Sequence, residues 1–158
     1  MITEERGVMT IGDVMIDGIA DRIDVNPDGS AAIIDYKTGG QFSKKALQEG
    51  RYPQLPIEAL MIEADGFEKL KSAKSKVLSY IVLTGGHEPG HVVSIDVRDH
   101  DVLKTTHDGL TQLINVFMDD DTPYICQPNP SHILRFNDYE HLERVGEWGT
   151  AGNEDDGS

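Results

Sequence analysis

Two short segments separated by a turn constrain the fold of this chain more than any other feature. The first reads GIADRID and carries Asp21, and the second reads AIIDYKTG and carries Asp35 and Lys37. Between them, Asn26–Gly29 supplies the proline and glycine that are typical of a tight turn. The pattern therefore predicts an antiparallel hairpin that brings Asp21 close to Asp35 and Lys37.

Two carboxylates and one amine at neighbouring strand ends suit the metal-assisted hydrolysis of phosphodiesters. Carboxylates hold hard divalent cations, and an ammonium group can orient a water or offset charge that builds on a phosphate. The alternative is that these are solvated charges at a strand end. The apolar run Ala31–Ile34 argues against this alternative, because Asp35 and Lys37 directly follow it on a strand that the pattern predicts to be buried.

Several motifs in this order resemble the RecB-type branch of the PD-(D/E)XK nucleases. GIADRID followed by IIDYKTG carries the likeness, which within that branch is greatest to the C-terminal nuclease domain of AddB proteins. The segment PQLPIEA, Pro53–Ala59, resembles the family's glutamine-bearing helix. YEHLERVGEW, Tyr139–Trp148, resembles the closing segment of alphaproteobacterial AddB proteins.

The resemblance implies an α/β fold, with a central mixed sheet of four or five strands flanked by helices and a metal site at one sheet edge. It implies metal-dependent DNA hydrolysis by an exonuclease module of AddAB-like or RecBCD-like double-strand-break repair. Asp21 and Asp35 would bind Mg²⁺ or Mn²⁺ together with the backbone carbonyl of Tyr36, and Lys37 would orient the attacking water. The partners would be DNA and an AddA-like helicase-nuclease subunit.

The resemblance also points to residues that could contact DNA. Gln54 would face the metal site and position the DNA, although a glutamine at a helix start is otherwise an ordinary solvated residue. Independently of the resemblance, Arg22 and Lys45 are candidate phosphate contacts, Lys45 because it closely follows the strand that carries Asp35 and Lys37. The alternative is that both are ordinary exposed bases. Family members often carry an aromatic residue where this chain has Glu58. Glu58 fits an outer metal ligand or a solvent-facing acid, and we prefer the second interpretation.

The chain departs from the family pattern in two places. Many AddB-like domains hold an iron–sulfur cluster with four cysteines, whereas Cys126 is the only cysteine here, which predicts no such cluster and no internal disulfide. RecB-type nucleases also have helices before the first acidic strand, but only seventeen residues precede Gly18. We therefore expect the C-terminal part of a larger AddB-like protein, or a shortened relative of it.

Composition bounds the class of protein. The chain of 158 residues suits one domain, which we assign to residues 1–148, followed by a disordered tail over 149–158. It shows no signal peptide and no apolar stretch that could span a bilayer, so we expect a cytoplasmic protein with no membrane partner. The formal net charge of −14 argues against a simple nucleic-acid binder, because phosphate binding needs a basic face.

Two metal motifs match only superficially. Asp24–Asp35 has the length of a calcium-binding EF-hand loop, but both of its flanks read as strands and its last position lacks the required glutamate. His87–His91 spells HEPGH, which matches the zincin pattern H-E-x-x-H, but Pro89 and Gly90 would break the helix on which that motif depends. We reject both sites.

Two rival functions remain open at this point. The first is a catalytically inactive, nuclease-like module that serves as a structural or DNA-guiding element. The second is a nuclease that acts on RNA.

The hydrophobic pattern also predicts the secondary structure along the chain. We expect an extended segment over 8–25, a strand over 31–36, a short helix over 43–49, a helix over 53–64, strands over 76–83 and 91–97, and a helix over 102–118.

Overall fold

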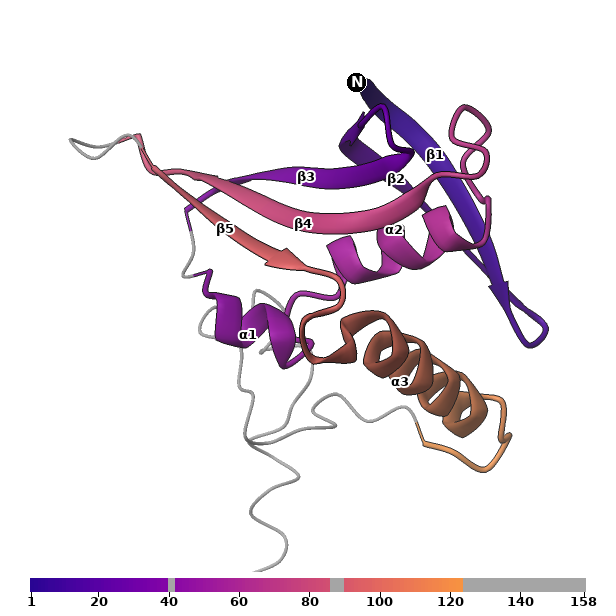
Figure 1. Cartoon of the computed structure of the whole chain (residues 1–158). Helices are drawn as coiled ribbons and strands as arrows, with labels where there is room; N and C mark the ends of the chain where they lie inside the picture. Colours follow the sequence, from indigo (N-terminus) through magenta and orange to yellow (C-terminus); the bar gives the residue numbers. More distant parts are fainter. Residues whose placement is uncertain (40–41, 86–89, 124–158) are drawn as a thin grey trace, which may run out of the picture. The chain divides into compact units, whose positions relative to one another are not determined.

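The computed structural model describes residues 1–39, 42–85 and 90–123, and within them a five-stranded mixed sheet forms the centre of the fold (Figure 1). Residues 1–118 form one unit and residues 119–158 another. In chain order the elements are β1 (Ile2–Ile11), β2 (Val14–Val25), β3 (Ser30–Thr38), α1 (Lys44–Gln48), α2 (Gln54–Glu63), β4 (Lys74–Leu83), β5 (His91–Asp96), a 3₁₀ turn (Asp99–Asp101) and α3 (Val102–Phe117).

The strands follow one another across the sheet in the order of the sequence. Strand β2 is antiparallel to both β1 and β3, β3 and β4 are parallel, and β4 and β5 are antiparallel. The parallel pair needs a crossover, which α1 and α2 provide. The predicted class, α/β with a mixed sheet flanked by helices, is therefore confirmed.

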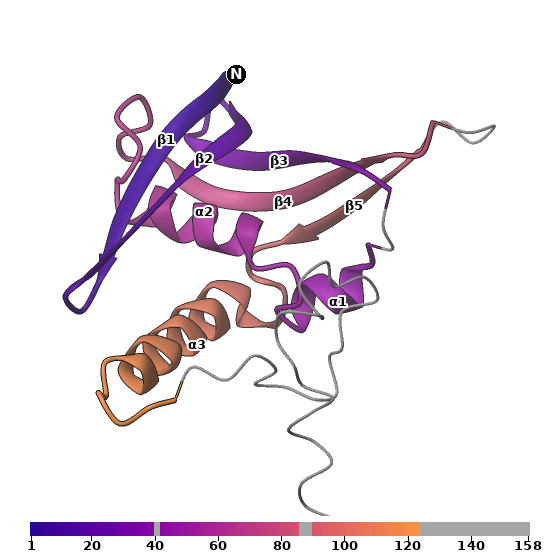
Figure 2. The same cartoon turned by 180° about the vertical axis from the view of Figure 1, so that it is seen from behind.

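The three described helices lie on one side of the sheet, as the two opposite views show (Figures 1 and 2). Helix α2 packs on this face with Leu55, Ala59 and Ile62 fully buried. The other face, which we expected helices to cover too, remains open in the described part of the chain. Tyr36 and Val92 are accordingly 42% and 61% exposed.

None of the described helices is long and apolar enough to cross a bilayer.

The first hairpin was only partly predicted. Sequence periodicity suggested one extended segment over residues 8–25, whereas the chain forms two strands that turn at Gly12 and Asp13. Gly12 has a φ of 58°, a left-handed conformation that glycine adopts without strain. The strand before this turn begins at Ile2, so the segment that precedes Gly18 forms a sheet edge rather than a helix.

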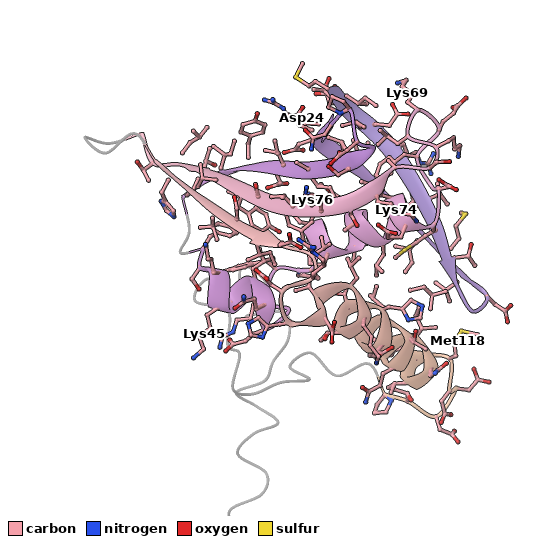
Figure 3. The ribbon with its side chains drawn as sticks, viewed as in Figure 1. Asp24, Lys45, Lys69, Lys74, Lys76 and Met118 are labelled. Carbon is pink, nitrogen blue, oxygen red and sulfur yellow. The ribbon has the colours of Figure 1, made fainter. Side chains whose placement is uncertain are left out.

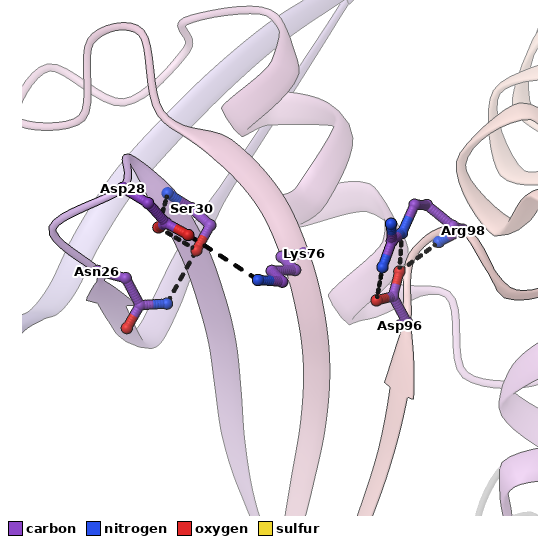
Figure 4. Close-up of polar contacts among 6 residues, drawn as sticks. All are labelled: Asn26, Asp28, Ser30, Lys76, Asp96 and Arg98. Atoms are coloured by element: carbon purple, nitrogen blue, oxygen red, sulfur yellow. Dashed lines mark hydrogen bonds and ion pairs between the residues drawn. The ribbon is translucent and has the colours of Figure 1, made fainter.

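The predicted hairpin between β2 and β3 is present. Its turn is fixed by Asp28, whose Oδ1 accepts hydrogen bonds from the backbone N–H of Ser30 at 2.9 Å and from the Ser30 hydroxyl at 2.6 Å (Figure 4). Asn26 Nδ2 also donates to Ser30 Oγ at 2.9 Å. Asp28 is thus a turn-forming residue between two strands, which agrees with the rejection of an EF-hand.

The alternation of inward and outward residues in β2 breaks at Asp21 and Arg22. Ala20 and Ile23 are 1% and 0% exposed, although residues three apart lie on opposite faces of a regular strand. In β1, Glu4 lies across from this break with a φ of 51°. Both strands of the hairpin therefore change their inward face here, and Asp21 lies at the point of change.

Candidate functional site

Acidic and basic side chains gather where the carboxyl end of β3 meets the start of α2. Asp35 follows the buried Ile33 on β3 and is itself only 1% exposed. Its Oδ1 accepts hydrogen bonds from Lys37 Nζ at 3.1 Å and from Gln54 Nε2 at 2.8 Å. Lys37 Nζ in turn donates to Gln54 Oε1 at 2.9 Å. The three side chains therefore form a closed ring of hydrogen bonds.

The second oxygen of Asp35 is less well satisfied. Lys37 Nζ lies 2.8 Å from Oδ2, an ion-pair distance. The geometry does not make this contact a hydrogen bond, and no other donor in the described residues reaches Oδ2. Burial of a carboxylate oxygen without a hydrogen bond costs free energy, and a further positive group near Oδ2 would offset this cost.

Asp21 reaches the same place from the neighbouring strand. The backbone pairing of β2 with β3 stops at Arg22 and Ile34. Beyond that point, the N–H of Tyr36 donates to Asp21 Oδ2 at 3.2 Å instead of to a strand partner. The predicted hairpin thus brings Asp21 beside Asp35 and Lys37. Nothing in the structure tests the expected role of the Tyr36 carbonyl.

Glu58 belongs to this cluster, and our preference for a solvent-facing acid was wrong. It lies one turn after Gln54 on α2 and is only 4% exposed. Gln54 Nε2 donates to its Oε1 at 3.1 Å, while Oε2 has no hydrogen-bond partner among the described residues. The apolar run Leu55–Ile62 around this single acid was a partial signal, because a helix that is apolar on most sides is largely buried.

The surroundings of Glu58 alter its acidity. Burial raises its pKa to about 7, and the charges of Asp35 and Asp21 add to the rise. The hydrogen bond from Gln54 and the charge of Lys37 oppose it. The charges of Asp21 and Asp35 therefore lie close enough to Glu58 to affect its acidity.

The donor set suits a hard divalent cation. Mg²⁺ and Mn²⁺ prefer carboxylate and carbonyl oxygens, and two buried carboxylate oxygens here lack hydrogen-bond partners. Within the described residues, however, no three acidic, histidine or cysteine side chains already stand in a metal-ligating arrangement. Lys37 and Gln54 interact with the acids instead, as the hydrogen-bond ring shows.

The three predicted DNA contacts lie in different settings. Gln54 stands inside the carboxylate cluster rather than at its rim. Arg22 is held by an ion pair with Asp24 at 2.7 Å and donates to the hydroxyl of Tyr36 at 3.2 Å. Lys45 lies on the outer side of α1 with 85% of its side chain exposed, 3.8 Å from Glu49 (Figure 3). The structure brings only Gln54 together with the predicted metal-binding acids.

Some sequence features fall outside the described residues. They include Cys126, the closing segment Tyr139–Trp148, the tail over 149–158 and most of the zincin-like segment. His91, the last residue of that segment, is described and belongs to β5, not to a helix.

Comparison with known proteins agrees with this architecture. A family model for the PD-(D/E)XK nuclease superfamily matches residues 1–131. An uncharacterized protein of Rickettsia bellii is 28% identical over 142 residues, which cover 82% of this chain and 16% of the relative. Uncharacterized proteins of Rickettsia conorii and Rickettsia typhi are 47% and 48% identical over 60 and 54 residues, or 38% and 34% of this chain and 7% and 6% of theirs. The chain thus spans a small part of the length of these curated relatives.

Proposed function

This chain belongs to the PD-(D/E)XK nuclease superfamily, and we propose that it hydrolyses DNA phosphodiester bonds with the help of Mg²⁺ or Mn²⁺. Nucleases of this superfamily generally depend on a divalent metal. The observation that carries the proposal is the buried Asp35, which has an ion-paired Lys37 at its side and one carboxylate oxygen without a hydrogen bond. A buried charge pair at a strand end, beside a second acid, has the chemistry that phosphate hydrolysis needs.

Each residue has a distinct role in this proposal. Asp21, Asp35 and the Tyr36 carbonyl would hold the cation, which when bound supplies positive charge near the scissile phosphate. Lys37 Nζ would orient the attacking water and offset charge that develops on the phosphate oxygens. The water oxygen forms a bond to phosphorus, and the bond from phosphorus to the leaving sugar oxygen breaks. The water loses a proton and the leaving oxygen gains one.

The setting that we propose is the processing of double-strand ends by an AddAB-like complex, with an AddA-like helicase-nuclease subunit as partner. The proposal draws on the resemblance of the closing segment to AddB proteins. It is supported by the charge of the chain, because most of the described Lys and Arg side chains are already ion-paired with acids. Besides Lys37–Asp35, these pairs are Arg6–Asp17, Arg22–Asp24, Lys45–Glu49, Arg51–Glu49, Lys69–Glu5, Lys74–Glu63, Lys76–Asp28, Arg98–Asp96 and Lys104–Asp108.

The alternative is a nuclease-like module without activity that guides DNA or supports a complex. It is favoured by one observation, namely that Lys37 and Gln54 stand among the acids and no three ligands in the described stretches are arranged around one ion. The retention of Asp21, Asp35 and Lys37 together argues against it, since an inactive module has no need of all three.

Thermal unfolding with and without metal separates the two functions. We expect millimolar Mn²⁺ to raise the melting temperature of the wild type and to leave that of Asp35→Asn unchanged. Linear duplex DNA and an RNA of the same sequence are then incubated with both proteins. Metal-dependent cleavage of DNA by the wild type alone supports the proposal. Metal binding without cleavage of either substrate would favour the inactive module, and cleavage of RNA alone would favour the ribonuclease.

A further inference from the structure

Helix α2 carries two glutamates whose surroundings differ sharply. Glu63, at its carboxyl end, accepts hydrogen bonds at Oε1 from the N–H and hydroxyl of Ser75 and pairs at Oε2 with Lys74 at 3.0 Å. Glu58 is more deeply buried, yet it accepts one hydrogen bond from a neutral amide, and its Oε2 accepts none from the described residues. Glu58 is also absent from every described ion pair. The contacts that stabilise Glu63 are thus missing at Glu58.

An acid buried without compensation is costly, so its surroundings normally supply a counter-charge. Among the described residues, no positively charged side chain forms an ion pair with Glu58. Gln54 Nε2 donates to Glu58 Oε1 at 3.1 Å and to Asp35 Oδ1 at 2.8 Å. One amide nitrogen therefore bridges the two acids, and each acid keeps one oxygen without a hydrogen bond. Two buried, incompletely satisfied carboxylates on either side of one donor have the character of a site for a cation.

We propose that Glu58 is the third acidic ligand of the cation site, together with Asp21 and Asp35, and that the Gln54 amide bridges Asp35 and Glu58 when no metal is bound. This inference rests on the proposed nuclease function and adds to it a residue from α2. An all-oxygen set of three carboxylates suits hard cations such as Mg²⁺ and Mn²⁺. Glu58 would also tie the metal to the helix, so that β2, β3 and α2 share one ion.

The test measures Mn²⁺ binding to the full chain by isothermal titration calorimetry and by the electron paramagnetic resonance signal of free Mn²⁺. Five proteins are compared: the wild type, Asp35→Asn, Glu58→Gln, Glu58→Asp and, as the control on the same helix, Glu63→Gln. Glu58→Gln keeps the shape of the side chain, and Glu58→Asp keeps its charge but shortens its reach. Circular dichroism confirms that each variant is folded before titration.

We expect Glu58→Gln to weaken Mn²⁺ binding at least about tenfold, Glu58→Asp to weaken it less, and Glu63→Gln to bind as the wild type does. If Glu58→Gln binds Mn²⁺ like the wild type while Asp35→Asn does not bind, Glu58 is no ligand, but the proposed function stands. Equal weakening by Glu58→Gln and Glu63→Gln would show a general effect of α2 and would overturn the inference. No binding by the wild type at millimolar Mn²⁺ would overturn the inference and the metal-dependent function together.

Discussion

The ammonium group of Lys37 lies 2.9 Å from Gln54 Oε1 and 3.1 Å from Asp35 Oδ1, so it joins the end of β3 to the first residue of α2. Its side chain also passes over the ring of the buried Tyr80, with Nζ 5.9 Å from the ring centroid. The charge of Lys37 is therefore held in one place by three neighbours. Such fixed positioning is what a group that orients water requires.

Replacement of Lys37 by alanine should separate catalysis from metal binding. We expect Lys37→Ala to lower the rate of DNA hydrolysis at least about 100-fold, because a positioned charge at the phosphate is lost, and to leave Mn²⁺ binding largely intact. Lys76→Ala is the control, since Lys76 pairs with Asp28 at the turn that precedes β3 (Figure 4). Hydrolysis and calorimetry measure the two effects. A parallel loss of activity and metal binding would mean that Lys37 is structural.

The central hairpin could be predicted because its signals are local. Asn26–Gly29 determines a turn, and the turn fixes the register that places Asp21 beside Asp35. The break in alternation at Asp21 could not be predicted, because no local pattern marks it; it lies across from the left-handed backbone of Glu4 in the neighbouring strand. The Gly12 turn was missed for a related reason, since the strand residues on both sides of it share one hydrophobic pattern.

The site was predicted less completely than the fold. Asp21, Asp35, Lys37 and Gln54 were proposed from their motifs and lie close together in the structure, whereas Glu58 was misjudged. Its burial depends on how α2 packs on the sheet, which the helix sequence alone does not specify. Lys45 was proposed because it follows the Asp-x-Lys strand closely, but α1 carries it to an exposed position next to Glu49.

Gln54 should stabilise the metal-free site through its hydrogen bonds to three partners. Gln54→Ala leaves Asp35 and Glu58 with fewer donors, so we expect its free energy of unfolding without metal to fall by about 1–3 kcal/mol. Gln48→Ala on α1 is the control and should change the free energy of unfolding little. Urea unfolding in the presence of a chelator measures this free energy for both variants and the wild type. Equal stability of Gln54→Ala and the wild type would show that the amide bridge contributes nothing.

The pH dependence of stability should reveal the acid on α2. Because the folded pKa of Glu58, about 7, lies above its ordinary 4.5, the fold favours the protonated form. Its contribution to the free energy of unfolding is complete below pH 4.5 and is lost as the pH rises to about 7. Glu58→Gln imitates the protonated acid. Without metal, the free energy of unfolding of Glu58→Gln should therefore equal that of the wild type at pH 4 and exceed it by up to about 3 kcal/mol at pH 8.

Glu63→Gln gives the contrasting control. At Glu63 the effect of burial is outweighed by hydrogen bonds from Ser75 and Lys74, which hold its pKa below the ordinary value. Its contribution to stability is present above that value and is lost as the pH falls, so Glu63→Gln should be less stable than the wild type at pH 8. Urea unfolding at pH 4 and pH 8 checks both variants. A Glu58→Gln difference that does not grow with pH would contradict the prediction.

Two glycines should respond oppositely to alanine. A Cβ on Gly66 would lie 1.9 Å from the carbonyl oxygen of Val8, so Gly66→Ala should destabilise the chain severely. The N–H of Val8 donates to the Gly66 carbonyl oxygen at 3.1 Å, a contact that joins β1 to the segment after α2. A Cβ on Gly109 in α3 meets nothing within 4 Å, so Gly109→Ala should stabilise the helix by about 0.5–1 kcal/mol. Melting temperatures of both variants test this. A mild effect at Gly66 would show that β1 does not approach this segment as described.

The isolated chain should bind DNA weakly and in a strongly salt-dependent way. Its net charge is −14, and residues 119–158 contain ten acids and two bases. Because most described Lys and Arg side chains already pair with acids, few remain to contact phosphate. Binding to a short duplex, measured by fluorescence anisotropy with and without Mn²⁺, should therefore be weak and fall further as salt rises.

Deletion of residues 149–158 offers a mild test of this electrostatic argument. It removes Glu154, Asp155 and Asp156 and leaves the rest of the acidic segment in place. We expect a small gain in affinity that disappears at high salt, because only long-range repulsion is relieved. A truncation of equal length cannot be taken from the folded unit, so the matched control is the full chain with these three acids changed to their amides. Tight, salt-resistant binding without metal or partner would show that the chain carries a DNA-binding surface that its charge does not reveal.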